Sequence, residues 1–336
     1  MAGRSWRWWA AAALALALAG CGDDDDAAGW RTEVDKTTLN GAVLSVWGSG
    51  PKDVYAVGGP LGNDGFETLA MHWDGKAWTA LAPGGSETLW WVSGSGPGDV
   101  WMVGEKGRIL RWNGTAFTAT PSGTTATLWG VVGFSPSDAW AVGGMPGSDG
   151  PDDVLLHWNG TSWVSEALPA PAKGLALFKV WGQVGGDLWV VGETGIIWRR
   201  GAAGVWSEES ARYTPKLARD RLFTVDGCAG DDVWAVGATD VLHWDGSAWS
   251  KQQVALPNIV NGVSCQGGEV TLVGFGGLKL RRAGAMWLDE SNLAPYSDLH
   301  GAWDDGAGSV WAVGGDFLSP ARPGVKRAGV IAHYRR

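Results

Sequence analysis

The sequence predicts an all-β protein, a seven-bladed β-propeller with four antiparallel strands in each blade. One repeat unit recurs seven times at spacings of 37 to 49 residues, a period typical of four-stranded propeller blades. Glycine and tryptophan are abundant, at 54 and 25 of 336 residues, which suits many short strands joined by tight turns. No segment after residue 20 shows a sustained 3.6-residue apolar period, so we expect almost no helix.

Residues 1–20 lie ahead of the repeats and have the pattern of a signal peptide. Arg4 and Arg7 precede a run of alanine and leucine that is short for a membrane span. The run ends in Leu18-Ala19-Gly20-Cys21, which resembles the lipobox of bacterial lipoproteins. The resemblance implies cleavage before Cys21 and acylation of this residue, whose several acyl chains would give a stable anchor. An ordinary secretory signal with a chance cysteine is the alternative.

Residues 21–29 form an acidic tether, because the adjacent carboxylates of Asp23 to Asp26 repel one another and stay solvated. The expected domains are therefore a signal peptide (1–20), this tether (21–29) and the propeller (30–336). We expect an exported protein held in the bacterial cell envelope by its lipid alone, with the outer membrane as the expected location.

Each repeat is built around the motif Asp-Val-Trp-Ala-Val-Gly, whose apolar run predicts a strand B that neighbouring blades cover on both faces. Its copies lie at 53–58, 99–104, 138–143, 187–192, 232–237, 269–274 and 309–314. Glycine ends all seven copies, which indicates either a positive φ or the close approach of another backbone segment. A Leu-x-x-Val-Trp segment such as 89–93 precedes the motif and predicts strand A.

A second motif, His-Trp-Asp/Asn-Gly-x-x-Trp, predicts strand C, a turn and strand D. The turn dipeptides are those of two-residue type I′ hairpins, in which both residues need a positive φ. They are Asp74-Gly75, Asn113-Gly114, Asn159-Gly160 and Asp245-Gly246.

The seventh repeat lacks a strand D. Its strands A, B and C fall at 299–303, 309–313 and 329–334, after which the given sequence stops. A segment that looks like a strand D, Trp30–Val34, precedes the first strand A. We therefore predict that Trp30–Val34 completes the last blade and closes the ring, which removes an open sheet edge.

The units Gly-Ser-Gly-Pro-x-Asp-Val-Trp-Ala-Val-Gly and Trp-Asp-Gly-x-x-Trp resemble the Trp- and Gly-rich propeller repeats of bacterial secreted proteins and lipoproteins. They resemble Asp-box (BNR) and Kelch-type propellers more distantly. The resemblance covers about residues 30–336 and departs from the true Asp-box in the order of its residues, so it carries no sialidase chemistry. It implies the fold and little about activity.

Charge and motifs narrow the function. Formal net charge is −9, and removing residues 1–20 with their two arginines leaves −11, which suits neither nucleic acid nor an anionic membrane surface. No Ser-His-Asp, His-Glu-x-x-His, P-loop or EF-hand pattern occurs. We therefore expect no catalytic residue, no metal and no cofactor.

Histidines and aspartates recur with the repeat, so most of them have a structural interpretation. The histidines of the second motif lie in non-adjacent blades and cannot share a metal; they are His72, His157, His243 and His333. The aspartates that open strand B are expected to accept hydrogen bonds from turn amides; they are Asp53, Asp99, Asp138, Asp187 and Asp232.

His300 is the exception, because it falls in strand A near the axis. The same position is predicted to carry a ring of side chains from all seven blades: Leu44, Trp90, Trp129, Phe178, Phe223, Val260 and His300. Such aromatic side chains pack between blades or stack on sugars at the channel mouth.

Cys228 and Cys265 are a candidate disulfide. Counting from strand B places both in the same position of adjacent blades 5 and 6. An exported protein meets an oxidising compartment, and a bond requires Cα atoms roughly 4.4–6.8 Å apart. Two free thiols are the alternative.

Loop length is the best functional clue. The B–C loops are long at 58–69, 143–153 and 314–328, and they share one face with the D–A loops, where binding sites commonly lie. Neutral drift of surface loops is the alternative. The candidate binding residues are Asp64, Glu67, Asp149, Asp152, Asp153, Asp316, Arg322 and His300. The acids of blades 1 and 3 also offer the oxygen ligands that calcium prefers, although solvated loop acids are commoner.

We therefore expect a monomeric, non-enzymatic binding or scaffolding lipoprotein. Its loop-rich face would meet a protein or a glycan at the cell envelope. A glycan lyase or hydrolase built on the same scaffold is the alternative function, and a purely structural envelope component is a third.

Overall fold

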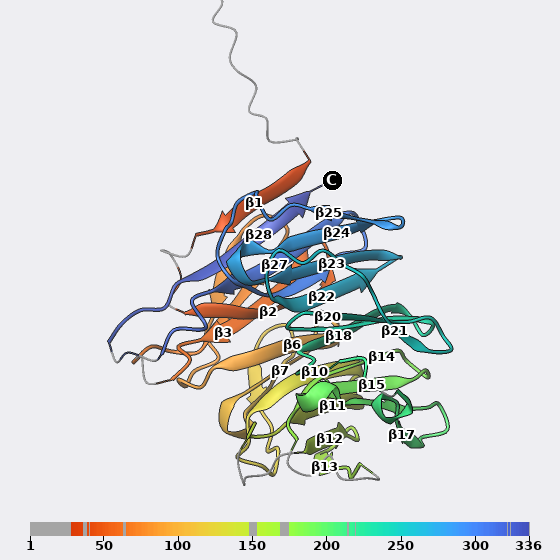
Figure 1. Cartoon of the computed structure of the whole chain (residues 1–336). Coiled ribbons are helices and arrows are strands. Elements are labelled where there is room, and N and C mark those ends of the chain that lie inside the picture. The colour runs from red at the N-terminus through yellow and green to blue at the C-terminus, as the bar shows by residue number, and fades with distance from the viewer. Residues whose placement is uncertain are drawn as a thin grey trace, which may run out of the picture.

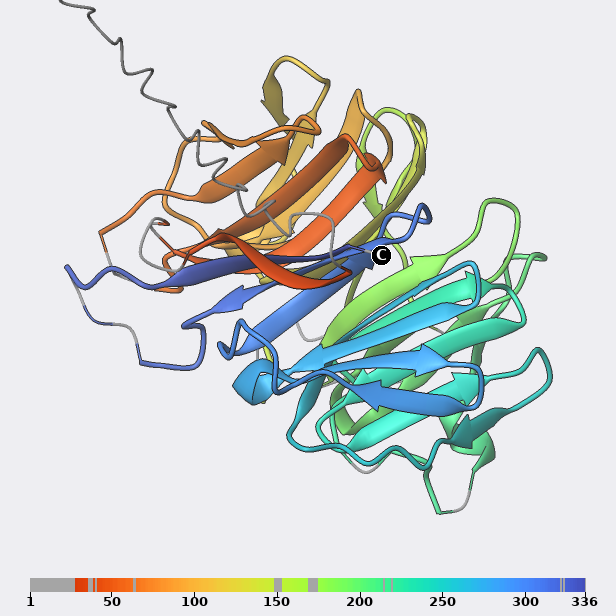
Figure 2. The ribbon, with the colours of Figure 1, turned by 90° about the horizontal axis from the view of Figure 1, so that it is seen from above.

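The computed structural model describes residues 28–35, 39, 41–62, 65–147, 153–168, 175–213, 215–218, 220–320, 322 and 324–335. They form seven antiparallel sheets of four strands each, and the first strands of successive sheets contact one another round a closed ring. Figures 1 and 2 show the chain passing from blade to blade in order of colour. The predicted seven-bladed β-propeller is confirmed.

We name the strands of each blade A to D from the axis outward. Blade 1 consists of β2 (Ala42–Gly50), β3 (Asp53–Gly59), β4 (Leu69–Trp73) and β5 (Trp78–Leu81). Blade 2 consists of β6 (Leu89–Gly96), β7 (Asp99–Gly104), β8 (Ile109–Trp112) and β9 (Phe117–Ala119). Blade 3 consists of β10 (Leu128–Ser135), β11 (Asp138–Gly143), β12 (Val154–Trp158) and β13 (Trp163–Ser165). Blade 4 consists of β14 (Leu177–Gly182), β15 (Leu188–Gly192), β16 (Ile197–Arg200) and β17 (Trp206–Glu208).

The remaining blades follow the same plan. Blade 5 consists of β18 (Thr224–Ala229), β19 (Asp232–Gly237), β20 (Asp240–Trp244) and β21 (Trp249–Lys251). Blade 6 consists of β22 (Val260–Gln266), β23 (Glu269–Gly274), β24 (Lys279–Ala283) and β25 (Met286–Asp289). Blade 7 consists of β26 (Leu299–Asp304), β27 (Ser309–Gly315), β28 (Gly329–Arg335) and β1 (Gly29–Val34). Single 3-10 turns lie in connections: η1 (Glu105–Gly107), η2 (Glu193–Gly195), η3 (Ser210–Arg212) and η4 (Phe275–Gly277).

Ring closure follows the prediction. β1 pairs antiparallel with β28, so the first described strand is the outer strand of the last blade, and the two lie side by side in Figure 1. Trp30 packs edge-on against Tyr334, with ring centroids 5.6 Å apart. Its Nε1 donates to Glu290 Oε2 at 2.7 Å. Arg335 donates to Glu33 at 2.8 Å. The hydrogen bond from His333, with a smaller effect of the Arg335 charge, lowers the pKa of Glu33.

The blade has two distinct ends because neighbouring strands run in opposite directions. The B–C and D–A connections share one face, which we call the loop face. The A–B and C–D connections share the opposite face, which we call the turn face. Gly29 lies opposite Arg335, at the end of strand C. The described chain therefore enters β1 from the turn face.

The glycine that ends strand B is explained by close approach. In every blade, a Cβ at this position would collide with a backbone carbonyl oxygen just ahead of, or at the start of, strand A, as Gly104 would with Thr88. None of the seven has a positive φ. The side chain is therefore excluded by the packing of strand A onto strand B.

The C–D hairpins differ from the prediction. Trp73 pairs with Trp78, which leaves a four-residue loop, and only the glycine of Asp74-Gly75 has a positive φ. Asp74 Oδ1 accepts hydrogen bonds from the amides of Lys76 and Ala77 at 2.8 and 2.9 Å. Asn113, Asn159 and Asp245 do the same. The type I′ assignment is therefore wrong, because a side chain rather than a second positive φ closes the turn.

Tryptophan triads join alternate pairs of blades. Trp101 of strand β7 lies 5.1 Å, centroid to centroid, from both Trp158 and Trp163 of the next blade. The same arrangement links Trp189 with Trp244 and Trp249, and Trp311 with Trp73 and Trp78. Edge-on and tilted rings at this spacing attract beyond their buried area, by about 0.5–1.5 kcal/mol per pair.

The recurring histidines and aspartates form pairs within blades. Nε2 of His72 lies 2.7 Å from Asp53 Oδ1, and the ring stacks on Tyr55 of strand B. His157 with Asp138 and His243 with Asp232 repeat this contact at 2.9 Å. In blades 2 and 4 an arginine replaces the histidine, in the pairs Arg111 with Asp99 and Arg199 with Asp187. The aspartates that open strand B therefore bind side chains of strand C. The prediction that they accept hydrogen bonds from turn amides is wrong, since the Asp and Asn residues of the C–D loops have that role.

Candidate functional site

The described candidate residues lie on the loop face. Glu67 and Asp153 lie in the B–C connections of blades 1 and 3, and Asp316 and Arg322 lie in that of blade 7. His300 lies at the loop-face end of β26, next to the axis. Since blade 2 separates blades 1 and 3, Asp153 belongs to a different sector of the face from the other four.

Some predicted residues lie outside the described part of the chain. They are Cys21, Asp64, Asp149 and Asp152, together with the signal peptide and the tether up to residue 27. The lipid anchor and the calcium hypothesis therefore stay predictions. In the described part of the chain, no helix has the length and apolar character needed to cross a membrane.

A continuous chain of aromatic contacts crosses the mouth of the channel on the loop face. We call it the aromatic floor, and its members in order of contact are Phe275, Phe317, His300, Trp90, Trp129, Phe178 and Phe223. Successive ring centroids are 4.6 to 6.4 Å apart. Phe178 is buried and the others are partly exposed. The floor therefore closes the channel with a surface of ring edges and faces.

Sequence counting placed five of these residues correctly and one neighbour wrongly. Val260 pairs with Gly274 as Leu299 pairs with Gly314, so Asn261, the next residue, shares the position of His300. The prediction for Val260 is wrong because the hairpin that joins β22 to β23 is one residue shorter than in blade 7: Val260 lies 14 residues before its partner Gly274, whereas Leu299 lies 15 before Gly314. Phe275 and Phe317 were missed, because they come from B–C connections rather than from strand A.

The long loops of blades 7 and 1 are joined by a buried arginine. Arg327 donates from Nε to Pro60 O at 2.8 Å and from Nη2 to Leu61 O at 3.2 Å, across the ring-closing seam. It also donates to the backbone oxygen of Asp316 in its own loop at 3.2 Å. These bonds hold the two loops as one rim, as loop length predicted. The predicted residue in this loop, Arg322, is exposed instead, and nothing in the sequence distinguishes the two arginines.

Apolar side chains stand exposed beside this rim. Tyr296 is 65% exposed and Leu293 42% exposed in the connection that leads into blade 7. Leu318 and Val325, in the B–C connection of blade 7, are 56% and 49% exposed. Phe317 ties this group to the aromatic floor through its contact with His300 at 5.2 Å. Together they form an apolar surface at the rim of the face, the kind of patch that marks an interaction site.

His300 has the environment of a packed neutral imidazole. Its Nδ1 lies 2.5 Å from the carbonyl oxygen of Leu44, so this nitrogen carries the proton. Burial, with a smaller effect of the nearby Lys179 charge, lowers the pKa of His300 to about 3. At neutral pH it therefore holds blades 7 and 1 together and contributes a flat ring to the floor.

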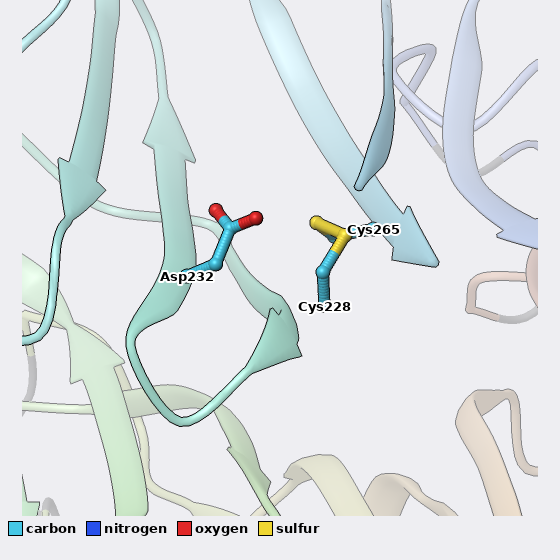
Figure 3. A group of neighbouring side chains, drawn as sticks. All are labelled: Cys228, Asp232 and Cys265. Carbon is cyan, nitrogen blue, oxygen red and sulfur yellow. A yellow bond between two sulfur atoms is a disulfide. The ribbon is translucent and has the colours of Figure 1, made fainter. Parts of the chain in front are cut away.

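The cysteines form a disulfide between blades 5 and 6. The Cα atoms of Cys228 and Cys265 are 4.8 Å apart (Figure 3). The two do not share one position in the repeat as counted, because Cys265 pairs with Val270 as Gly227 pairs with Val233, and Cys228 occupies the bulge after Gly227. Asp232 lies within 4.8 Å of both sulfur atoms. A metal bound at this site would need cysteine thiolates as ligands, and sulfur atoms joined in a disulfide are not thiolates.

Comparison with known proteins supports the fold. No protein-family model matches the sequence, and no curated protein matches it. The structure of YCF48 bound to D1 peptide is similar, with a TM-score of 0.67 at 13% identity over 93% of this chain and 98% of that one. Virginiamycin B lyase from Staphylococcus aureus has a TM-score of 0.67 at 12% identity over 90% and 99%. The WD40 β-propeller domain of Doa1 has a TM-score of 0.65 at 11% identity over 90% and 97%. At these identities the likeness shows a shared propeller fold.

Proposed function

We propose that the protein is a cell-envelope lipoprotein whose loop face binds an apolar segment of another protein, without catalysis. One observation carries this proposal. The aromatic floor reaches Phe317, and its chain neighbour Leu318 is exposed, as are Val325 of the same connection and Tyr296 of the connection before blade 7. Exposed apolar side chains of this size mark an interaction site.

The chemistry of the surface favours a protein segment over a glycan. Leucine and valine side chains match apolar side chains of a peptide, whereas a sugar needs aromatic faces flanked by polar groups. The loops are held by a rigid ring and by Arg327, so little ordering cost accompanies binding. The similar structure of YCF48 bound to D1 peptide is a precedent for peptide binding on this fold. The similar lyase gives no catalytic residue, because chemistry does not follow from fold.

Site-specific photocrosslinking in the intact envelope tests the binding face. A photoreactive phenylalanine at position 318 is expected to give a discrete protein adduct, identified by mass spectrometry. Position 184 is the matched control, since Val184 is equally apolar and 79% exposed but lies in an A–B turn. Adducts at 184 with none at 318 would contradict the assignment. A glycan ligand would give no protein adduct at either position.

Lipidation is tested separately. Metabolic labelling with an alkyne fatty acid is expected to mark the protein and to be abolished by Cys21→Ser. Label that survives this substitution, or a fully soluble unlabelled protein, would reject the anchor while leaving the crosslinking result intact.

A further inference from the structure

A cavity of about 520 Å³ opens at the turn-face end of the channel. The ends of strand A in all seven blades line it, so it lies opposite the aromatic floor. Trp91 of blade 2 borders the cavity, reaches Gly301 of blade 7 and carries the ammonium of Lys179 4.1 Å from its ring. Trp91 and Lys179 therefore separate the cavity from the floor. We call this space the turn-face cavity.

Indole rings form much of its wall. Trp47, Trp181 and Trp303 line the cavity along with Trp91. The first three lie over glycines of the following blade, because a Cβ at Gly94, Gly227 or Gly48 would collide with the respective indole. The glycines thus leave room for large indole rings at the cavity mouth. Packing alone could be achieved there with smaller side chains in place of the indoles.

The only charged groups among the described lining residues are two carboxylates. Asp226 of blade 5 and Asp304 of blade 7 flank Ser264 of blade 6, whose hydroxyl accepts from the amide of Asp304 at 2.9 Å. Asp226 accepts from the amides of Cys265 and Gly227 at 2.9 and 3.0 Å. These amides fix the direction of the carboxylate without cancelling its charge. No lysine, arginine or histidine lies among the residues described as lining the cavity.

The electrostatics of this wall favour an incoming cation. Burial raises the pKa of Asp226 to about 7, and the neighbouring charge of Asp304 adds to the rise. An ionised carboxylate is therefore costly here until a positive charge approaches it. Indole faces attract the same charge through their quadrupole.

We propose that the turn-face cavity binds a small organic cation, an ammonium group carried on an apolar body. The ammonium lies against Asp226 and Asp304, and the apolar body lies against the indoles of blades 1, 4 and 7. A bare metal ion suits the site poorly, because hard cations need six or more oxygen ligands and only two carboxylates lie among the residues described as lining the cavity. The inference does not depend on lipidation or on the loop-face partner.

Calorimetry on the mature protein in neutral detergent tests the proposal, with choline and benzylammonium as probes. Their neutral counterparts, 3,3-dimethylbutanol and benzyl alcohol, have nearly the same shape without the charge. We expect at least one cation to bind, with its neutral counterpart at least tenfold weaker. Asp226→Asn and Asp304→Asn are each expected to weaken cation binding at least tenfold, whereas Asp231→Asn, an exposed acid in an A–B turn of the same face, leaves it unchanged.

Trp181→Leu separates the aromatic contribution from folding. It keeps an apolar side chain at this position but removes an indole, so cation binding should weaken. Unchanged melting temperatures of the aspartate variants would confirm that their propeller is intact. The proposal is overturned if neither cation binds at 10 mM, if cation and neutral counterpart bind equally, or if calcium alone binds.

Discussion

At the residue scale, the glycine after strand B lets strand A lie directly on the strand B backbone. Each of the seven copies faces backbone at, or just ahead of, the start of strand A. Not every nearby glycine carries this demand. Gly96, at the end of strand A in blade 2, has open space where a Cβ would point.

Replacing Gly104 with alanine should therefore destabilise the whole ring. The added methyl group would collide with the carbonyl of Thr88, and overpacking of this kind costs about 1–3 kcal/mol. Thermal unfolding measured by circular dichroism should show a lower midpoint for Gly104→Ala and no change for Gly96→Ala. Equal midpoints for the two variants would show that strand A shifts to admit the methyl group without loss of stability.

Lys179 is the other residue with a measurable signature. Its ammonium is buried, donates to Trp129 O at 2.8 Å and lies close enough to His300, in a blade across the ring, for its charge to lower the pKa of that histidine. Burial lowers the pKa of Lys179 to about 7, whereas the unfolded chain keeps the ordinary value of about 10.5. The unfolded state therefore binds more protons between pH 7 and 10.5, so this residue's contribution to stability rises with pH across that window.

Lys179→Met should be more stable than the parent at pH 6 by about 1–4 kcal/mol. The advantage should shrink steadily towards pH 10, because above pH 7 the folded parent holds its lysine neutral, and the unfolded chain's preference for the proton fades as the pH approaches about 10.5. Urea unfolding at several pH values gives the difference, and the exposed Lys76→Met serves as control. An advantage that is independent of pH would mean that the methionine acts through packing alone.

At the scale of the element, the strands could be predicted and the connections could not. Strand B could be predicted from its apolar run and the glycine that ends it. The outer strand at Trp30–Val34 could be predicted because it matches the strand D that the seventh repeat lacks. The C–D turns were misjudged because Asn-Gly and Asp-Gly also fit a four-residue loop closed by a side-chain oxygen. Cys228 and Val260 were misplaced because bulges and loop lengths shift the count by one residue. Arg327 could not be found, since its partners are backbone oxygens 266 and 267 positions away.

Arg327→Met should loosen the blade 7 loop. The variant keeps an apolar stem but loses the bonds to Pro60 and Leu61, so the loop should open locally without unfolding the ring. Limited proteolysis with chymotrypsin should cut after Phe317 or Leu318 several times faster than in the parent. Arg322→Met, in the same loop but exposed, is the matched control. Unchanged cleavage would show that the rim is held by its other contacts.

At the scale of the whole molecule, both ends of the described chain meet in one blade. The seven-fold plan and its closure follow from periodicity alone, because a repeated unit can bury its faces only against copies of itself. The candidate sites did not follow, because the aromatic floor joins strand A with B–C connections, and the turn-face cavity joins seven different segments. Tertiary packing brings these separate segments together, and the sequence pattern of a single repeat does not show which of them meet.

Trp30→Ala tests closure. This indole packs on Tyr334 and donates to Glu290 of blade 6, and loss of a buried tryptophan costs about 3–5 kcal/mol. The melting temperature of the entire domain should fall by several degrees in a single transition. The exposed Thr32→Ala, in the same strand, should change it little. A separate early transition confined to blade 7 would show that the ring does not unfold as one unit.

The pairing of β1 with β28 also sets an order of events in time. Synthesis delivers a polypeptide from its amino end, so β1 leaves the ribosome long before its partner strand is available. Blade 7 cannot form until residues 329–335 arrive, and until then β1 and the exposed edge of β27 are both open to other strands. Strand β28 thus converts an open arc of blades into a closed ring. A chain cut short before residue 329 would keep two unpaired strand edges, at β1 and β27, however well its first six blades had folded.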